Sequence, residues 1–256
     1  MKILVLIKQV PDTWGDRHLD LLTGRADRTA EDQVIDEVGE RAIEAALVAR
    51  DTLGAEVIVG TMGPSGATDA LRKALAMGAD SAIHLSDDAL AGSDLVRTAR
   101  MLHLLIQDCA PDLVISGNES TDGRGGMIPA MLAELTGWPQ GTSLQSIEIE
   151  GTSVRGTRVT DTGTAEISCA LPAVVSVTEQ APEPRFPTFR GIMKAKKKPL
   201  RQLMVGDIGG TDLLAGPVSV IVCTAERPPR TAGTKIVDEG NAGRELADYL
   251  IGARLI

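Results

Sequence analysis

The chain has 256 residues, of which 43% are hydrophobic, 24% charged and 2% aromatic, and its formal net charge is −9. This size fits one large α/β domain or two small ones, with a core of aliphatic residues and Met. The acidic balance argues against general nucleic-acid binding, because phosphates repel most of such a surface. No apolar run approaches about 18 residues, so we expect no membrane insertion, and the apolar part of the N-terminus is too short for a signal peptide.

The cysteines, Cys109, Cys169 and Cys223, lie far apart in the sequence and form no CxxC pair. Neither a disulfide framework nor a zinc site is therefore indicated. Reduced, buried thiols are the expected state, which favours a cytoplasmic protein.

Through the first half of the chain, short apolar runs alternate with segments of helical periodicity. Strands are predicted at 2–8, 56–61, 81–85 and 112–117, and helices at 40–53, 66–80, 93–108 and 125–137. The first helix ends before Gly54, Gly78 closes the second, and Ser93 is the expected N-cap of the third. This alternation predicts right-handed βαβ units and an open, mainly parallel sheet with helices on both faces, which is an α/β fold.

After Trp138 the pattern changes. Residues 146–180 carry β-branched runs around turn pairs such as Glu150-Gly151, which is typical of β-hairpins. A strand at 218–223 is predicted to return to the main sheet, and 243–256 has the pattern of an amphipathic helix.

Two predicted strand ends are rich in glycine, at 60–66 and at 117–127. Ligands of open α/β sheets bind beyond the carboxyl ends of the strands, and glycine lets backbone N–H groups approach a phosphate. Gly123, Gly125 and Gly126 therefore suggest a phosphate cradle. The chain has no Walker motif and no GxGxxG after a strand, so a flexible loop that caps a helix remains the alternative.

No catalytic or metal-binding constellation is visible in the sequence. His18, His84 and His103 lack metal-ligand spacing, and His84 is expected to be a core histidine within a strand. Asp122 is either a catalytic acid or a turn aspartate that bonds to its own backbone, and the latter is commoner.

The segment 183–200 is unusual, because it contains both phenylalanines of the chain, Phe186 and Phe189. Seven Lys/Arg and no Asp/Glu lie between Arg185 and Arg201. Three prolines, at 182, 184 and 187, predict an extended surface loop. Its lysines could contact nucleic acid, be solvated, or face an acidic partner, and its phenylalanines either bind a partner or pack back onto their own domain.

Several stretches together resemble the β subunit of electron-transfer flavoproteins, in its actinobacterial form. The most specific is LPAVVSVTEQAPEPRFPTFRGIMKAKKK at 171–198, and others are MKILVLIKQVPD at the start, residues 62–80 and 116–142, and RTAGTKI at 230–236. The resemblance runs from residue 1 to about 256.

The resemblance implies a Rossmann-like domain at 1–225, with a hairpin arm at 146–180 and a recognition loop at 182–201, and a C-terminal extension at 226–256 that clasps an α subunit. It implies a heterodimer in which the α subunit holds most of the FAD site and the β subunit buries one AMP. In electron-bifurcating relatives a second FAD occupies that AMP site. Such a protein is an electron carrier, not an enzyme, in the bacterial cytoplasm. It takes electrons from acyl-CoA dehydrogenases of fatty-acid β-oxidation to a quinone oxidoreductase.

The family's AMP site carries over to the end of the first strand, the turn 36–40, the second strand's end and the loop 117–128. The corresponding residues are Leu6, Asp36, Gly39, Met62, Gly117, Asp122, Gly123, Gly125, Gly126, Met127 and Ile128. Asp36 and Gly39 depart from the family, which often has an Asn-containing turn there. A carboxylate at this place could accept from a hydroxyl or amine of adenosine, but it would repel phosphate.

The turn at 161–163 matches a family hairpin that leans toward the flavin, and a family Glu before it is replaced by Arg158 or Val159. In the family, a loop that docks to the dehydrogenase carries an apolar anchor, which corresponds to Phe189 here. The resemblance implies that five further residues of this loop also contact the dehydrogenase: Arg190, Ile192, Met193, Lys194 and Lys197. Two rival functions remain, a stand-alone protein that binds or hydrolyses adenine nucleotides and a nucleic-acid-binding module that uses 194–201.

Overall fold

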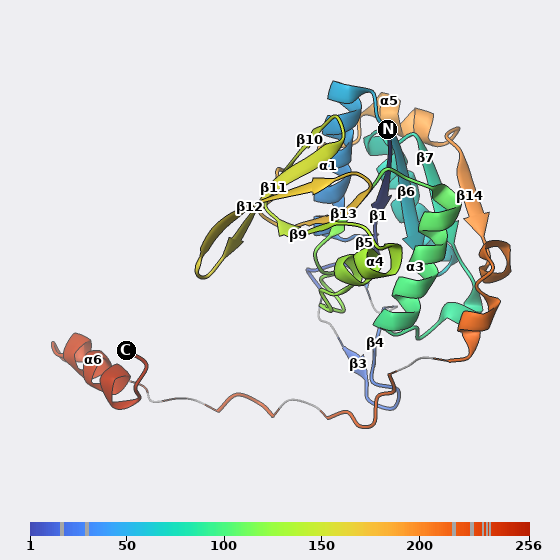
Figure 1. Ribbon diagram of the computed structural model, residues 1–256. Coiled ribbons are helices and arrows are strands. Elements are labelled where there is room, and N and C mark those ends of the chain that lie inside the picture. The colour runs from blue at the N-terminus through green and yellow to red at the C-terminus, as the bar shows by residue number, and fades with distance from the viewer. Residues whose placement is uncertain are drawn as a thin grey trace. The chain divides into compact units, whose positions relative to one another are not determined.

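Figure 1 shows the computed structural model of the chain, which describes residues 1–15, 18–28, 31–216, 219–225, 228–231, 233, 235 and 237–256. The chain divides into two compact units, Met1–Val222 and Cys223–Ile256. The predicted boundary after residue 225 stays a prediction.

The first unit is built on a sheet of seven strands in the order β14-β7-β6-β1-β8-β13-β9. All neighbouring pairs are parallel, and at the centre Val5 pairs with both Val59 and Ile115. The strands are β1 (Lys2–Leu6), β6 (Glu56–Met62), β7 (Ser81–Leu85), β8 (Leu113–Gly117), β9 (Gln140–Leu144), β13 (Ala173–Val177) and β14 (Leu200–Leu203). The predicted α/β fold with a parallel sheet is confirmed.

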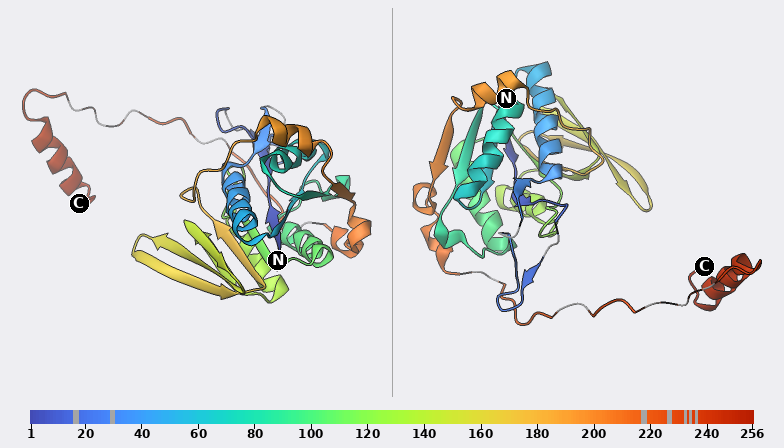
Figure 2. Two further views of the ribbon diagram at one scale, coloured as in Figure 1. Left: turned by 90° about the horizontal axis from the view of Figure 1, so that it is seen from above. Right: turned by 180° about the vertical axis from the view of Figure 1, so that it is seen from behind.

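Helices cover both faces of this sheet (Figures 1 and 2). On one face, α1 (Glu37–Leu53) and α2 (Thr68–Met77) pack on alternate strand residues such as Ile3 and Val5, and the short α5 (Phe189–Ala195) packs against α2. On the other face, α3 (Leu95–Cys109) and α4 (Ile128–Thr136) pack on Leu4 and Leu6. Strand residues are buried from both sides, which explains why the strands read as continuous apolar runs.

The helix ends differ from prediction by a few residues. α1 begins at Glu37 and not at 40, because the buried carboxylate of Asp36 accepts from the N–H of Val38 as an N-cap. Asp94, and not Ser93, caps α3 by accepting from the N–H of Arg97, while the Ser93 hydroxyl donates to Leu90 O. α4 starts at Ile128, so the glycines from 123 to 126 precede the helix.

The predicted hairpin region 146–180 contains two different structures. β10 (Ser146–Glu150), β11 (Ser153–Thr160) and β12 (Gly163–Ala170) form an antiparallel arm, which projects from the main sheet in Figure 1. β13 instead joins the central sheet, where all five of its residues are buried. The prediction that 146–180 is all hairpin was therefore wrong for β13, whose unbroken apolar character suits a parallel strand covered on both faces.

The prediction of one extended loop at 182–201 was wrong. The middle of this segment forms α5 and its end enters β14, which pairs with β7 at the edge of the sheet. The three prolines all precede Thr188, the N-cap of α5, so they do not interrupt the helix. The strand predicted at 218–223 is also wrong for residues 219–223, which are not in a strand, and Val218 lies outside the described residues.

Smaller elements complete the first unit. Two short antiparallel pairs lie near the N-terminus, β2 (Gln9–Pro11) with β5 (Gln33–Ile35), and β3 (Leu19–Asp20) with β4 (Arg25–Ala26). Single 3-10 turns occur at η1 (Ser65–Ala67), η2 (Asp88–Leu90), η3 (Val205–Ile208) and η4 (Thr211–Leu214).

The second unit contains one helix, α6 (Ala242–Gly252), where an amphipathic helix at 243–256 is predicted. Its apolar side chains Leu246, Tyr249 and Ile251 are exposed. Within the described part of the chain, every helix is too short or too polar to cross a membrane.

Candidate functional site

The carboxyl ends of β1, β6 and β8 meet at one edge of the sheet and bring together the residues predicted for a nucleotide site. Leu6 pairs with both Gly60 and Ser116, so Met62 and Gly117 lie beside the end of β1. The Thr61 hydroxyl donates to Ile7 O over 2.9 Å and fixes β6 to the residue after β1. We call this place the carboxyl-edge site.

Asp36 joins the turn before α1 to the loop 117–128. Its carboxylate accepts from the N–H of Val38 (3.2 Å) and from both the N–H and the hydroxyl of Thr121 (2.7 and 2.8 Å). Its side chain is buried. The carboxylate that the sequence analysis places beside an adenosine is thus already engaged by protein donors, and its effect on a phosphate is reduced accordingly.

Close backbone packing explains two glycines of the site. A Cβ at Gly117 would lie 3.1 Å from the Cβ of Val38, and a Cβ at Gly39 would lie 3.6 Å from the Ile35 side chain and 3.9 Å from Ile7. The end of β8 therefore packs tightly on the first turn of α1, and a larger residue at Gly117 would push the two apart.

Asp122 is a buried carboxylate paired with two partly exposed cations. Its side chain is only 1% exposed and forms ion pairs with Lys8 (2.7 Å) and Arg28 (2.8 Å). It also accepts from the N–H of the next residue, Gly123, over 2.6 Å, as a turn aspartate does. Burial raises the pKa of Asp122, but the hydrogen bond and charge of Lys8, with further hydrogen bonds from Ser120 and Arg28, hold this pKa well below its ordinary value. Asp122 therefore stays ionised and cannot act as a catalytic acid near neutral pH.

The sequence analysis missed Lys8 and Arg28. The position of Lys8, directly after a predicted central strand, could have placed it at this edge. Arg28 is far from Asp122 in sequence and belongs to no periodic element, so nothing in the local pattern connects the two.

The loop before α4 has unused hydrogen-bond donors. The backbone N–H groups of Gly125, Gly126, Met127 and Ile128 donate to no group in the described part of the chain. Met127 gives α4 no side-chain cap, and Gly126 has a φ of 61° that favours glycine. Free N–H groups at the start of a nine-residue helix form a site with affinity for anions.

Two buried polar atoms at the end of β8 also lack partners within the described residues, namely Ser116 Oγ and Asn118 Oδ1. Buried polar atoms without partners are rare in native proteins and call for an explanation, such as a bound molecule. Together with the free N–H groups, they fit a nucleotide, whose phosphate accepts from the loop and whose sugar and base offer both donors and acceptors.

Charges around the loop balance one another, because the carboxylate of Asp36, held by Thr121, adds a further negative charge. Lys8 and Arg28 carry two positive charges against the single negative charge of Asp122. Arg124 and Glu119 are exposed charges of opposite sign, and the Glu119 carboxylate lies 3.7 Å from where a Cβ on Gly126 would be. This balance permits a single phosphate group more readily than a long polyphosphate.

The second candidate region is the segment around α5. Phe186 is 91% exposed and Phe189 81% exposed, so neither packs back onto its own unit. Ile192 and Met193 of α5 are also exposed. Thr188 caps the helix by accepting from the N–H of Gly191 over 3.0 Å. Phe189, predicted to lie on an extended loop, is therefore the first residue of a short helix.

The backbone on both sides of these aromatic residues is anchored. Arg185 forms ion pairs with Glu44 and Asp51 of α1, at 2.8 Å each, and Arg72 of α2 donates to Ala195 O over 2.8 Å. A Cβ at Gly191 would overlap Ala76 O, so α5 lies directly against the last turn of α2. The segment is rigidly held while its large apolar side chains remain exposed.

The seven cations of this segment do not form one positive patch. Arg185 is paired with acids of α1, Arg201 pairs with Asp108, and Lys198 donates to backbone carbonyls at the end of α2. Four exposed cations of the segment form no ion pair within the described residues, namely Arg190, Lys194, Lys196 and Lys197.

The tip of the arm is exposed, and Val159 near it is partly accessible. Arg158 turns back to β9, where its guanidinium donates to Thr142 O over 2.7 Å and to the Thr142 hydroxyl over 3.0 Å. The predicted flavin contact of the 161–163 turn stays a prediction.

His84 is fully buried, as expected. Its ring nitrogens lie 3.2 Å from the Thr68 hydroxyl and 3.1 Å from Gly63 O, so it links β7 to the loop after β6. The prediction of a satisfied core histidine is confirmed. Within the described residues, no group of three or more His, Cys, Asp and Glu has the geometry of a metal site.

The parallel sheet with helices on both faces defines a doubly wound α/β protein. Comparison with known proteins then gives the family. The electron transfer flavoprotein domain matches residues 23–208. The electron transfer flavoprotein subunit beta of Mycobacterium leprae (strain TN) is 47% identical, over 99% of each chain. The protein of the same name from Bacillus subtilis (strain 168) is 32% identical, over 98% of this chain and 97% of the relative.

A further relative is the caffeyl-CoA reductase-Etf complex subunit CarD of Acetobacterium woodii, which is 34% identical over 98% of this chain and 97% of its own length. The chain belongs to the electron transfer flavoprotein family, and the resemblance to β subunits seen in the sequence is confirmed. Its general role is electron transfer. The individual site residues stay predictions.

Proposed function

We propose that this chain is the β subunit of a heterodimeric electron carrier that accepts electrons from acyl-CoA dehydrogenases and delivers them to a quinone oxidoreductase. The observation that carries the docking half of this proposal is Phe189, an exposed aromatic side chain on a rigidly anchored helix. An anchored aromatic loses little entropy when it enters a partner's pocket, which is how binding hot spots are built.

The β chain also binds AMP at the carboxyl-edge site in this proposal. The N–H groups of Gly125 to Ile128 hold the phosphate, Lys8 and Arg28 keep Asp122 neutralised beneath the loop, and Ser116 and Asn118 contact the nucleoside. Leu6 and Met62 line the apolar side. The AMP takes part in no reaction and stabilises the fold by mass action.

FAD supplies the redox chemistry in the assembly and is held mainly by the α subunit. This chain contributes the arm, whose exposed tip leans toward the partner, and α6, whose exposed apolar side chains need a cover. Burial of each such side chain stabilises by roughly 1.5–3 kcal/mol. We therefore expect the isolated chain to aggregate, and to become monodisperse when it is produced with the α subunit.

The decisive experiment is denaturation of the purified heterodimer and identification of the released nucleotides. One FAD and one AMP per heterodimer are expected. Two FAD and no AMP would replace the AMP assignment with the electron-bifurcating alternative. Release of FAD alone would overturn the β-chain nucleotide site altogether.

A substitution tests the location of the AMP. At Gly125, a Cβ would lie 2.9 Å from Leu95 Cδ2, so Gly125→Val crowds the loop without meeting fixed backbone. The variant should lose AMP and keep FAD. Gly206→Val is the matched control. Gly206 lies in η3, outside the loop 117–128, and a Cβ there would meet nothing within 4 Å. Full AMP retention by Gly125→Val would contradict the location.

The stand-alone nucleotide hydrolase is disfavoured by the state of Asp122, which is ionised and held between two cations. ATP turnover by this chain without a partner would reinstate it. The cytoplasmic location remains a prediction.

A further inference from the structure

A cavity lies at the opposite edge of the sheet from the carboxyl-edge site. Because α2 follows β6 and runs antiparallel to it, the last turn of α2 lies at the amino edge of the sheet, and α5 packs against this turn. The cavity between them has a volume of about 210 Å³. We call it the α5 cavity; its charged lining residues are Arg50, Arg190, Lys194 and Lys198.

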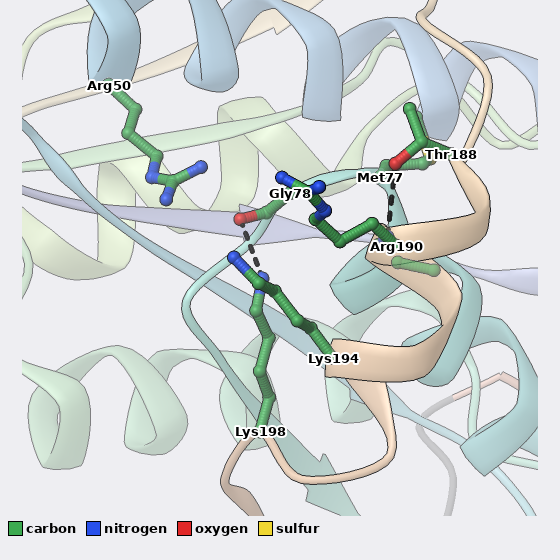
Figure 3. A pocket seen from close by; sticks show the side chains of 9 residues that line it. Arg50, Met77, Gly78, Thr188, Arg190, Lys194 and Lys198 are labelled. Carbon is green, nitrogen blue, oxygen red and sulfur yellow. Dashed lines mark hydrogen bonds between the residues drawn. The ribbon is translucent and has the colours of Figure 1, made fainter.

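Figure 3 shows these four cations around the carbonyl group of Gly78, with Arg190 and Lys194 reaching in from α5 and Arg50 from α1. Two of them are compensated. Lys198 Nζ donates to Leu75 O and Gly78 O over 3.0 Å each, and Arg50 pairs with Asp80 over 3.3 Å.

The other two are not. The side chains of Arg190 and Lys194 form no hydrogen bond or ion pair with any residue that the structure describes. The cavity therefore holds two uncompensated positive charges, one able to offer a planar fork of donors and the other a flexible ammonium group.

The cations of the cavity act on one another. Burial, together with the positive charges of Arg50 and Lys194, lowers the pKa of Lys198. An anion placed among them removes this mutual repulsion and gains charge-assisted hydrogen bonds from Arg190 and Lys194.

The charge and the donors indicate the kind of anion. Two unpaired cations are balanced by a dianion, and the Thr188 hydroxyl, which accepts from the N–H of Gly191, keeps its own hydrogen free to donate. A water molecule occupies about 30 Å³ of liquid, so the cavity has room for an anion of several atoms. A carboxylate offers one charge and two oxygens, and a phosphate offers two charges and more acceptor oxygens.

We propose that the α5 cavity is a binding site for a doubly charged phosphate group, from inorganic phosphate or from a small phosphomonoester. The site is separate from the AMP loop and does not depend on the docking function. A bound phosphate there neutralises half of the unpaired positive charge of the segment that carries Phe189, because Arg190 and Lys194 are two of its four exposed cations that form no ion pair within the described residues.

The test uses the full chain purified with its α subunit. Sodium phosphate is titrated by calorimetry and by ³¹P NMR at constant ionic strength, with sodium chloride as the reference. One saturable phosphate per chain is expected. The double variant Arg190→Gln/Lys194→Gln should raise the dissociation constant for phosphate by about tenfold or more, because it removes both charged donors.

The matched control is Lys196→Gln/Lys197→Gln, which removes the same charge from neighbouring exposed positions outside this cavity. It should leave phosphate binding unchanged. Arg190→Lys keeps the positive charge but removes the planar fork of donors, so it should weaken phosphate binding several-fold. This single variant still tests the proposal if the double variant does not fold. A parallel titration with glycerol 3-phosphate distinguishes the sources, since tighter binding of the ester indicates a phosphomonoester.

Three results would overturn the proposal. The first is a response to phosphate no larger than that to chloride. The second is equal binding by the wild type and the double variant, which would move the phosphate to another site. The third is a double variant that binds phosphate normally and only docks a dehydrogenase more weakly, which would assign the cavity to a carboxylate of the partner.

Discussion

The loop 117–128 of the carboxyl-edge site and the segment 182–201, here called the α5 segment, are both held in place by charged side chains of or beside α1. At its N-terminus, Asp36 holds the loop 117–128 through Thr121, and along its length Glu44 and Asp51 hold Arg185. The two regions differ in what is left unsatisfied. The loop leaves backbone N–H groups free, and the α5 segment leaves aromatic side chains exposed.

This difference separates two modes of recognition. Free N–H groups next to compensated charges suit a small anion, which needs directed donors and little apolar area. An exposed aromatic residue on an anchored helix suits a protein surface, where burial of one large side chain provides most of the affinity. Predictions that disturb one region and leave the other intact test whether the separation is real.

The largest effect is expected from Phe189→Ala. Loss of an aromatic anchor costs about 2 kcal/mol or more of binding, or roughly thirty-fold in affinity for the dehydrogenase. FAD content, AMP content and folding should be unchanged, because the side chain is 81% exposed. The measurement is steady-state reduction of the carrier by a cognate acyl-CoA dehydrogenase over a range of carrier concentrations.

Phe186→Ala is the control for that experiment, since it removes the same side chain from a position outside α5. Its effect on the apparent affinity should be much smaller. If Phe189→Ala leaves both the apparent affinity and the maximal rate unaltered, α5 is not the docking element.

The next effect is expected from Asp36→Ala. The variant loses an N-cap, at a cost of about 1 kcal/mol, and also loses the two hydrogen bonds that Thr121 donates to the carboxylate, at a further cost of about 1–3 kcal/mol. We expect AMP to be released from the loosened loop while docking to the dehydrogenase is kept. Nucleotide analysis and urea denaturation measure the two effects.

Asp94→Ala is the matched variant, because Asp94 caps α3 in the same way and its carboxylate accepts from the N–H groups of Arg97 and Ser219. It should lose stability and keep AMP. Equal loss of AMP from both variants would mean that the nucleotide responds to general destabilisation and not to the Asp36–Thr121 contact.

A smaller effect is expected when Lys196 and Lys197 are both changed to Gln. These exposed charges act at a distance, so the association rate with an acidic partner should fall a few-fold and its dependence on salt should flatten. The dissociation rate should barely change. Stopped-flow association at several ionic strengths checks this, and a changed dissociation rate with an unchanged salt slope would place these lysines in direct contact with the partner.

The smallest effect concerns acid stability. The pKa of Asp122 in the folded state lies below its ordinary value of 3.8, so its ionised form contributes stability above about pH 4, and this contribution is lost as the pH falls further. Lys8 and Arg28 are 41% and 45% exposed, so solvent screens the ion pairs and the contribution is modest.

Asp122→Asn should therefore be less stable than the wild type at pH 7, and the difference should shrink below pH 4. Urea denaturation between pH 3 and pH 7 measures it, with Asp212→Asn, at an exposed position on η4, as a control for general charge effects. A constant difference across this range would show that packing of the side chain, and not its charge, stabilises the loop.

Much of the fold followed from local sequence patterns. The central strands β1, β6, β7 and β8 are short apolar runs bounded by turn residues, and α1 and α2 end at glycines. Such features depend on neighbours within a few residues, so a single sequence reveals them. β13 and β14 were missed as strands of the main sheet, because membership of a parallel sheet is decided by partners far away in the chain.

The sequence by itself determined the α/β class, the glycine-rich loop at a strand end and the family, because these rest on periodicity and on motifs that are contiguous in the chain. Only the tertiary structure decided how the charges are used. It paired Asp122 with Lys8 and Arg28, occupied Asp36 with Thr121, and withdrew Arg185, Lys198 and Arg201 from the positive surface of the α5 segment. A charge in a sequence has no fixed partner until folding brings distant residues together, and the remaining free groups then define where a ligand or a partner can bind.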